Sequence, residues 1–404
     1  MIERMKYESL LKVSYKKDQD YASICQNRIN NECATFLDFT ILSNDAFYLT
    51  NQEILLLITK IMSVDKELTK KTDTLPEIAL NQYTIQSLIN EIKQTNDIEN
   101  VYSTKKEIRE TYKRIEKGID KGRFKGLVSK YLMFKTKGNI KLESCQDIRN
   151  LYNELVLDEV IEEDKDNAPD GLIFRKEIVN VHAASGKIIH KGLYPEDKII
   201  NAMTNALKVL NDSSINYLIS AAIFHYMFAY IHPFYDGNGR TDRFISSYVI
   251  SKNLNPLVAY KFSYVVKKHQ KQYYNMFSDT NNPRNMGDVT PFIIQFLEFI
   301  LEAEKELVED VDKRLADLDF FMYKISQLNL NEFETDIAYI LLQNSLFDEE
   351  GLTKARICSI KKKSNNTITK TIHNIESKNS SIIRCVPDGN RKLYDLDLNA
   401  LAEL

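Results

Sequence analysis

An apolar segment of 17 residues, INYLISAAIFHYMFAYI at positions 215–231, restricts the folds open to this chain. A helix that crosses a membrane needs about 20 apolar residues, so this segment is short for a span. It also contains His225 and is followed directly by a charged loop. We therefore predict a helix buried in a protein core, with no membrane as a partner.

The length and composition of the chain favour a mainly α-helical protein with more than one unit. Its 404 residues exceed the roughly 250–300 that one hydrophobic core accommodates. Its 12 Gly and 8 Pro leave little room for strands and tight turns. Apolar residues at three- and four-residue spacing predict further helices at 78–119, 145–161, 196–212 and 241–253, and a long acidic helix ending near 318.

Charge and cysteine content indicate a cytoplasmic protein without a disulfide framework. The formal net charge of −3 gives no overall attraction to nucleic acid or to anionic membranes. The five cysteines are scattered and form no C-x-x-C pair, and the N-terminus lacks the apolar run of a secretory signal. The tail at 351–404 differs, because ten Lys and Arg against five Asp and Glu make it +5.

The segment HPFYDGNGRTDR, at 232–243, has the residues of a polyphosphate site. Gly237 and Gly239 let the backbone approach an anion at the start of a helix. Arg240 and Arg243 lie three residues apart on one helix face, which suits more than one phosphate. The loop joins two helices and lacks G-x-x-x-x-G-K-[ST], so it is neither a P-loop nor a dinucleotide fingerprint.

Two residues of the same segment predict the chemistry. Asp236 offers the carboxylate oxygen that Mg²⁺ needs when it bridges nucleotide phosphates. His232 ends the buried helix, is held there by Pro233, and with a pKa near neutrality is suited to accept a proton from a hydroxyl. We predict transfer of a phosphorus-containing group from a Mg-nucleotide to a hydroxyl.

This segment resembles the signature of the Fic-domain family, H-P-F-x-[DE]-G-N-G-R-x-x-R, at all nine specified positions. The resemblance implies an all-α core that transfers AMP from ATP to a Ser, Thr or Tyr hydroxyl of a target protein and releases pyrophosphate. It also implies a role for each residue of the motif. His232 would be the general base, Asp236 the Mg²⁺ ligand, Gly237, Asn238 and Gly239 the anion hole, Arg240 a phosphate contact, and Arg243 the γ-phosphate contact.

Similarity to the family extends at lower specificity over about 95–300. Short β-type runs on either side of HAASG predict a hairpin with its turn at Ser185 and Gly186. The hairpin resembles the family's flap, which binds the target's main chain as an added strand; an ordinary surface hairpin is the alternative. The flap candidates are Lys187, Ile188, Ile189 and His190, and Tyr273, Tyr274 and Asn281 lie in a stretch that resembles the family's nucleoside-closing segment.

The stretch TNDIEN, at 95–100, resembles the family's inhibitory motif [ST]-x-x-x-E-[GN]. The resemblance implies that Glu99 pairs with Arg243 and occupies the guanidinium meant for the γ-phosphate. It also suggests that Glu99 orients a water that removes AMP from a modified target. The alternative is a solvated glutamate on a charged helix.

The tail at 331–404 has a pattern of predicted elements that differs from the rest of the chain. Three short helices followed by two strands predict a winged helix-turn-helix, with NNTITKTIHNIE as its recognition helix. Arg384, Arg391 and Lys392 would form a basic wing. Such modules bind either DNA or another protein, and the sequence leaves both open.

The prediction for the whole chain is a mainly α protein: a Fic-type helical core with a short β-hairpin flap, followed by a small winged helix-turn-helix. The expected segments are an N-terminal region at 1–90, a catalytic core at 91–305 with an inhibitory helix near 85–105, a helical linker at 306–330 and the winged helix at 331–404.

Two alternatives remain. The chain could be a nucleotide-sensing, DNA-binding transcriptional regulator, or His225, His232 and Asp236 could bind zinc. The oligomeric state stays open, a homodimer included.

Overall fold

The computed structural model describes residues 6–136, 138–182, 188–379, 381–389 and 391–404. They form two compact units, one of Met1–Asp65 and Leu88–Lys305 and one of Lys66–Ser87 and Glu306–Leu404. The chain passes between the units within three long helices, α3 (Gln52–Thr72), α4 (Glu77–Ile98) and α15 (Thr290–Ser326). The predicted consecutive segments therefore do not correspond to these units, because each unit is built from two separate stretches of the chain.

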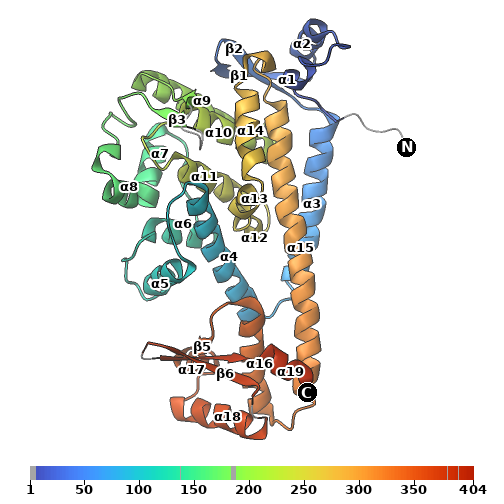
Figure 1. The fold of residues 1–404 in the computed structure, drawn as a ribbon, viewed down its shortest axis with the longest axis vertical. Helices are drawn as coiled ribbons and strands as arrows, with labels where there is room; N and C mark the ends of the chain where they lie inside the picture. The colour runs from blue at the N-terminus through green and yellow to red at the C-terminus, as the bar shows by residue number, and fades with distance from the viewer. Residues whose placement is uncertain (1–5, 137, 183–187, 380, 390) are drawn as a thin grey trace. The chain divides into compact units, whose positions relative to one another are not determined.

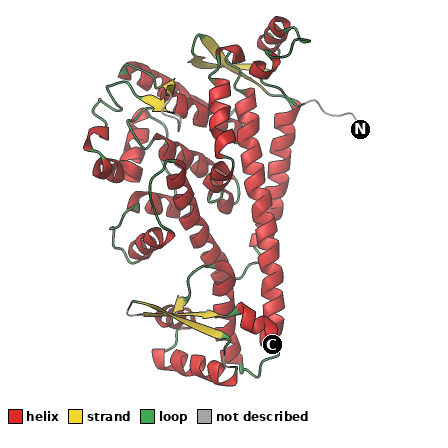
Figure 2. Ribbon diagram, in the orientation of Figure 1, coloured by secondary structure: helices red, strands yellow, loops and turns green. Residues whose placement is uncertain are grey.

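The first unit is built mainly of helices (Figures 1 and 2). Besides the parts of α3, α4 and α15 that belong to it, its helices are α1 (Leu10–Val13), α2 (Tyr21–Ile29), α5 (Lys105–Glu116), α6 (Lys125–Lys135), α7 (Cys145–Tyr152), α8 (Asp158–Glu163), α9 (Glu196–Asn211), α10 (Tyr217–Ile231), α11 (Asn238–Asn253), α12 (Pro256–Ala259), α13 (Phe262–Lys268) and α14 (Gln270–Thr280). A π-helical stretch at Asn153–Leu157 joins α7 to α8, and 3₁₀ turns lie at Lys165–Asn167 and Pro283–Asn285.

The predicted core helix is confirmed as α10. Its buried residues number 13 of 15, and it packs against α9 and α11. It begins after Asn216, whose side chain accepts a hydrogen bond from the backbone N–H of Leu218. Within the part of the chain that the structure describes, no helix has the length and apolar character to cross a membrane.

A hairpin near the N-terminus was not predicted. Strands β1 (Ala34–Ile41) and β2 (Asn44–Leu49) pair antiparallel. The backbone N–H of Leu42, in their turn, donates to the Tyr230 hydroxyl at 2.9 Å, and the Phe39 ring packs edge-on against Tyr230. Because Tyr230 lies two residues before His232, this hairpin supports the end of α10 that carries the predicted base.

Other helices lie where the hydrophobic spacing placed them. The pattern at 78–119 corresponds to two helices, α4 and α5, separated by the non-helical residues 99–104. The pattern at 145–161 corresponds to α7, the π-helical stretch and α8 in succession. The small predicted hairpin is present as β3 (Asn180–His182) and β4 (Ile188–Lys191), while its predicted turn lies outside the described residues.

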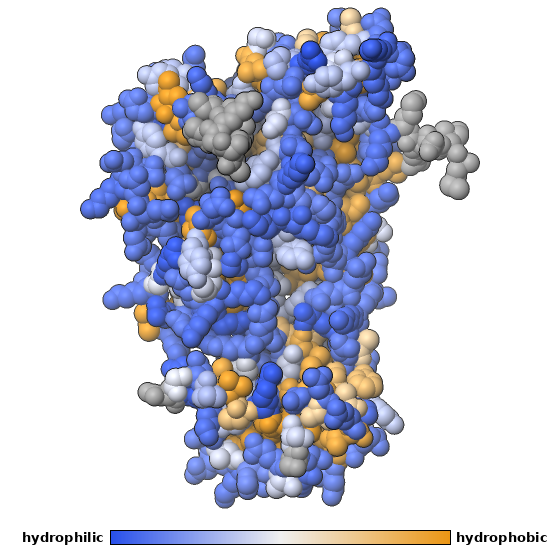
Figure 3. All heavy atoms as spheres, viewed as in Figure 1, coloured by the Kyte–Doolittle hydropathy of each residue, from blue (hydrophilic) through white to orange (hydrophobic). Residues whose placement is uncertain are grey.

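The second unit contains the three helices and two strands predicted for the tail. They are α16 (Glu332–Phe347), α17 (Lys354–Lys361), α18 (Asn365–Lys378), β6 (Ile383–Asp388) and β7 (Arg391–Leu396), to which the structure adds β5 (Leu352–Thr353) and α19 (Leu398–Glu403). The sheet has the antiparallel order β5-β7-β6. In Figure 3 hydrophobic side chains gather over this unit, among whose exposed apolar residues are Phe320 and Tyr323.

Candidate active site

His232 occupies the residue that ends α10. It has left-handed backbone angles (φ 52°, ψ 63°), and Pro233 follows it. Its carbonyl oxygen accepts a hydrogen bond from Nε of Arg175 at 2.9 Å. The fully buried Arg175 also donates to the carbonyl of Leu193, so one guanidinium fixes the backbone at the mouth of the site.

The imidazole of His232 is a neutral base at physiological pH. Its pKa is lowered from 6.5 to about 4, mainly by burial and also by electrostatic interaction with His190 and Arg175, while a hydrogen bond with the Ala229 backbone opposes the shift. The predicted pKa near neutrality is therefore wrong. The ring is therefore unprotonated throughout the physiological range and able to accept a proton, although a low pKa also makes it a weaker base.

The loop between α10 and α11 is held in one shape by its own side chains. Asn238 accepts from the backbone N–H of Phe234 at 2.9 Å and donates to its carbonyl at 2.8 Å. Gly237 has φ +75°, which glycine adopts without strain. The Phe234 ring stacks on Tyr152 at 3.7 Å between centroids. The backbone at the start of α11 is thus preorganised.

Arg240 is buried without a hydrogen-bond partner. Its exposed fraction is 1%, and none of its three guanidinium nitrogens bonds to any described residue. Asp236 lies 3.8 Å from its Nη2. Burial raises the pKa of the nearby Glu159 to about 7, although Arg240 opposes this shift, so Glu159 offsets the cation only in part. A buried cation in this state is costly unless an anion joins it.

The guanidinium of Arg243, one turn further along α11, already has side-chain partners. Its Nη2 lies 2.7 Å from Oε1 of Glu99, and its Nε donates to the hydroxyl of Thr95 at 2.9 Å. Burial would lower the pKa of Arg243, but Glu99, with smaller contributions from Tyr273 and Tyr274, raises it above its usual value in sum. A Cβ atom at Gly239 would collide with Oε1 of Glu99, so this carboxylate lies directly against the predicted anion hole.

The turn after α4 explains why the motif around Glu99 ends in Gly or Asn. Asn100 has φ +59°, a left-handed conformation that these two residues adopt most readily. The backbone N–H of Val101 then donates to the carbonyl of Asn96 at 2.9 Å and closes the helix end. The turn fixes the backbone from which Glu99 reaches Arg243.

Asp236 is suited to a hard cation. Its carboxylate is 41% exposed, and Oδ1 accepts the backbone N–H of Gly237 at 2.6 Å. A carboxylate with access to water beside a phosphate site fits Mg²⁺, which keeps several waters and takes few protein ligands.

The geometry does not favour the zinc alternative. Both ring nitrogens of His225 are engaged, with the hydroxyls of Ser246 and Tyr273, each at 2.9 Å. Within the described parts of the chain, no three His, Cys, Asp or Glu side chains are grouped as metal ligands would be.

The three predicted nucleoside contacts have different surroundings. Tyr273 is buried with its hydroxyl on His225, and Asn281 accepts from the hydroxyl of Tyr226 at 2.7 Å. Tyr274 is 41% exposed, and its hydroxyl donates to the carbonyl of Ile98. Their contact with a nucleoside stays a prediction.

The flap strand β4 is anchored through His190, whose Nε2 lies 2.6 Å from the carbonyl oxygen of Tyr230. Burial lowers the pKa of His190. Lys187 lies outside the described residues, as do the side chains of Ile188 and Ile189. The contact of this strand with a target stays a prediction.

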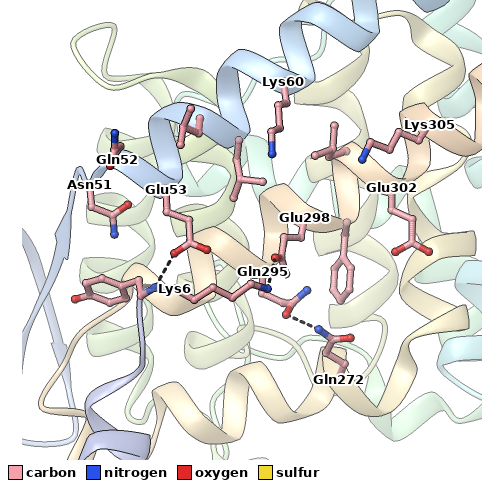
Figure 4. A pocket seen from close by; sticks show the side chains of 15 residues that line it. Lys6, Asn51, Gln52, Glu53, Lys60, Gln272, Gln295, Glu298, Glu302 and Lys305 are labelled. Atoms are coloured by element: carbon pink, nitrogen blue, oxygen red, sulfur yellow. Dashed lines mark hydrogen bonds and ion pairs between the residues drawn. The ribbon is translucent and has the colours of Figure 1, made fainter. Parts of the chain in front are cut away.

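A separate open hollow of about 730 Å³ lies between α3 and α15 in the first unit (Figure 4). No residue of the 232–243 motif lines it. Several of its charges are already paired: Lys6 lies 3.8 Å from Glu298, and Glu302 bonds to Lys268. It therefore does not compete with the motif as the catalytic site.

Arg175, Thr95 and Tyr152 were not predicted as parts of the site. Arg175 acts on backbone carbonyls, and Tyr152 donates its hydroxyl to the carbonyl of Asp236 at 3.1 Å. Contacts to backbone atoms leave no pattern in a sequence. Thr95 could have been predicted from the sequence, because it is the first specified position of the inhibitory motif.

Comparisons with known proteins agree with this geometry. Residues 143–250 match the model of the Fic/DOC family. A crystal structure of a Fic family protein from Desulfovibrio desulfuricans G20 superposes with a TM-score of 0.53 at 18% sequence identity, covering 86% of this chain and 97% of that one. This likeness shows a shared helical fold.

Two curated relatives carry the name protein adenylyltransferase Fic. The protein from Nematostella vectensis is 34% identical over 101 residues, which are 24% of this chain and 22% of the relative. The protein from Aedes aegypti is 29% identical over 109 residues, 27% of this chain and 17% of the relative. The chain spans about a fifth of the length of these relatives. Residues 143–250 thus match a Fic/DOC domain, and the fold of the chain is similar to that of a mainly helical Fic family protein.

Proposed function

We propose that this chain is a protein adenylyltransferase, which transfers AMP from Mg-ATP to a Ser, Thr or Tyr hydroxyl of a target protein. The observation that carries the proposal is the buried guanidinium of Arg240, which lacks a hydrogen-bond partner among the described residues. It lies in the first turn of α11, beside Gly237 and Gly239. Backbone N–H groups and a cation together favour a phosphate chain there.

The chemistry follows from the neutral imidazole. His232 accepts the proton of the target hydroxyl, whose oxygen then attacks the α-phosphorus of ATP. The bond from the α-phosphorus to the bridging oxygen breaks, and pyrophosphate leaves. Mg²⁺ held by Asp236 would neutralise charge on the phosphates. Arg240 and the start of α11 hold the phosphates in line, so positioning and electrostatics supply most of the rate.

Glu99 restrains this activity. Its carboxylate holds Arg243, which would otherwise bind the γ-phosphate, and it lies against Gly239. ATP therefore binds in an unproductive position until Glu99 moves. Glu99 would also orient a water that attacks the phosphorus of AMP on a modified target, a hydrolysis that releases free AMP and restores the target hydroxyl.

The test uses ATP labelled either at the α- or at the γ-phosphate. Purified Glu99→Gly protein with Mg²⁺ and a cell lysate should transfer the α-label to protein, and the Glu99→Gly, His232→Ala double variant should transfer none. Transfer of the γ-label by the Glu99→Gly protein above the level that the double variant gives would indicate phosphorylation and overturn the proposal.

The same experiment separates the enzyme from the nucleotide-sensing regulator. A regulator binds ATP without covalent transfer of any label. Calorimetry on the double variant supplies the matching control, because His232 is needed for the chemistry and not for binding. ATP binding without label transfer by Glu99→Gly protein would therefore favour the regulator.

A further inference from the structure

We propose that the second unit binds duplex DNA, with α18 in the major groove and the β6–β7 hairpin beside it on the backbone. This proposal is independent of adenylyl transfer. It rests on the order of the elements, on which cations are paired, and on the composition of one exposed helix face.

The order and pairing of the elements match a winged helix-turn-helix. Helix α16 is followed by β5, α17, α18 and the β6–β7 hairpin, and β7 lies between the other two strands. Helix α17 ends at Lys362, which has φ 51°, and Ser364 caps α18 by accepting from the backbone N–H of Thr367. Two helices joined by so short a turn form the unit that presents its second helix to DNA.

The buried side of α18 leaves a polar face exposed. Ile368, Ile372 and Ile375 point into the unit. The residues that face solvent are Asn365, Asn366, Thr367, Thr369, Lys370, His373, Asn374, Ser377 and Lys378. None of these side chains is a carboxylate, so the face carries amide, hydroxyl, imidazole and ammonium groups. Those groups can bond to base edges and phosphates.

The cations of the tail divide into paired and unpaired sets. Lys361 pairs with Asp336, Lys378 with Glu334, and Arg384 with Asp395, so these three stabilise the unit. Six further cations have no ion pair with any described residue, and each is exposed. They are Arg356 on α17, Lys362 and Lys363 in the turn, Lys370 on α18, and Arg391 and Lys392 on β7.

This pairing divides the predicted wing. Arg384 bonds to Asp395 at 2.9 Å across the strands, so its charge is partly compensated, and the cations of this hairpin without an ion pair to a described residue are Arg391 and Lys392. Two pairs of neighbouring cations therefore flank α18 along the chain. Lys362 and Lys363 lie in the turn before it, and Arg391 and Lys392 lie in the hairpin after it. That arrangement suits the two phosphate strands that border a major groove.

Duplex DNA explains this surface better than a protein does. A partner protein would need apolar anchors at the centre of the contact, and the exposed face of α18 offers none. Duplex RNA is a poorer fit, because its deep, narrow major groove does not admit a helix.

The test is fluorescence anisotropy with the full-length protein and labelled duplexes of about 20 base pairs, roughly two turns. If four to six of the cations contact phosphates, the logarithm of the binding constant should fall with the logarithm of salt with a slope of about −4 to −5. Duplex DNA should bind about tenfold or more tightly than duplex RNA of the same sequence.

Two double variants locate the surface. Lys362→Gln with Lys363→Gln, and Arg391→Gln with Lys392→Gln, should each weaken binding about tenfold and make the salt slope shallower by about 2. The control, Lys66→Gln with Lys70→Gln on α3, removes the same charge from exposed positions of the same unit and should bind like the wild type.

Each of three outcomes would overturn the proposal. They are no binding at about 50 mM salt, where electrostatic binding is strong, equal losses in the control and the test variants, and equal affinity for DNA and RNA duplexes. Circular dichroism of every variant establishes that it is folded.

Discussion

Oε1 of Glu99 lies 2.7 Å from Nη2 of Arg243 and rests against Gly239. The pair joins the turn after α4 to the first turns of α11 within the first unit. One carboxylate thus takes up a guanidinium and lies where a phosphate oxygen would approach the helix start. Under the proposed function, ATP would have to displace this carboxylate in order to bind with all three phosphates in place.

Replacement of Glu99 by glycine should therefore raise transfer of the α-label from ATP about tenfold or more, since couplings of this kind amount to about 1–3 kcal/mol. Glu99→Gln should give an intermediate rise, because it keeps the bulk and loses the charge. Asp97→Asn is the control: Asp97 pairs with Lys93 and not with Arg243. Equal rates in wild type and Glu99→Gly would remove the inhibitory role.

Two of the buried arginines of the site, Arg240 and Arg175, should respond in opposite directions to replacement by methionine. Arg240 has no hydrogen-bond partner among the described residues and a single, long ion pair with Asp236 at 3.8 Å, so Arg240→Met removes a buried charge that is only partly compensated. The melting temperature without nucleotide should stay equal or rise by a few degrees. The rise in melting temperature that Mg-ATP gives the wild type should disappear. Differential scanning fluorimetry measures both quantities.

Arg175→Met is the matched control. Arg175 donates to the carbonyls of His232 and Leu193, and these would lose their partners in the interior. The variant should lose about 3 kcal/mol or more of unfolding free energy. If Arg240→Met destabilises the free protein as strongly as Arg175→Met does, Arg240 is a structural residue and not a phosphate contact.

The pH dependence of transfer should reflect the low pKa of His232. Burial brings this pKa to about 4, below the ordinary 6.5, so the ring stays neutral from about pH 5.5 upward. The rate of the Glu99→Gly protein at low ATP should be level between pH 6 and 8, with its acid limb well below 6.5. An inflexion near 6.5 would mean that the ring is solvated and outside the pocket.

Much of the site was predictable because its residues are consecutive. The 232–243 motif contains the proposed base, the proposed metal ligand, Arg240 and Arg243, and helical spacing predicted the helices α10 and α11 on either side of it. The motif around Glu99 was recognisable because a left-handed residue must follow the glutamate, which restricts Asn100 to few residue types.

Other features were not predictable, for two physical reasons. The β1–β2 hairpin has the alternation of a strand in ATFLDFTI, but its turn lacks glycine and proline, and Ser43, Asn44 and Asp45 are a weaker turn signal, from which no hairpin was predicted. The pKa of His232 depends on burial and on charges from Arg175 and His190, which are distant in the sequence. The pairing of Arg384 with Asp395 likewise depends on strand register.

The buried carboxyl of Glu304 on α15 leads us to expect that its replacement by glutamine will stabilise the first unit. Glu304 is 0% exposed, and neither of its oxygens bonds to a described residue. Burial, aided by the charge of Asp65, raises its pKa from 4.5 to about 9. Because the folded pKa lies above the unfolded one, the stability that this group contributes is complete below about pH 4.5 and is lost as pH rises toward 9.

Glu304→Gln removes that ionisation and should stabilise the protein at pH 8 by on the order of 2 kcal/mol, with almost no effect at pH 5. Glu302→Gln is the control, because Glu302 is bonded to Lys268 and His269 and its removal should give no gain at pH 8. Urea unfolding of the three proteins at both pH values measures the difference. A gain of the same size at pH 5 and pH 8 would show that packing, and not ionisation, sets the effect of Glu304.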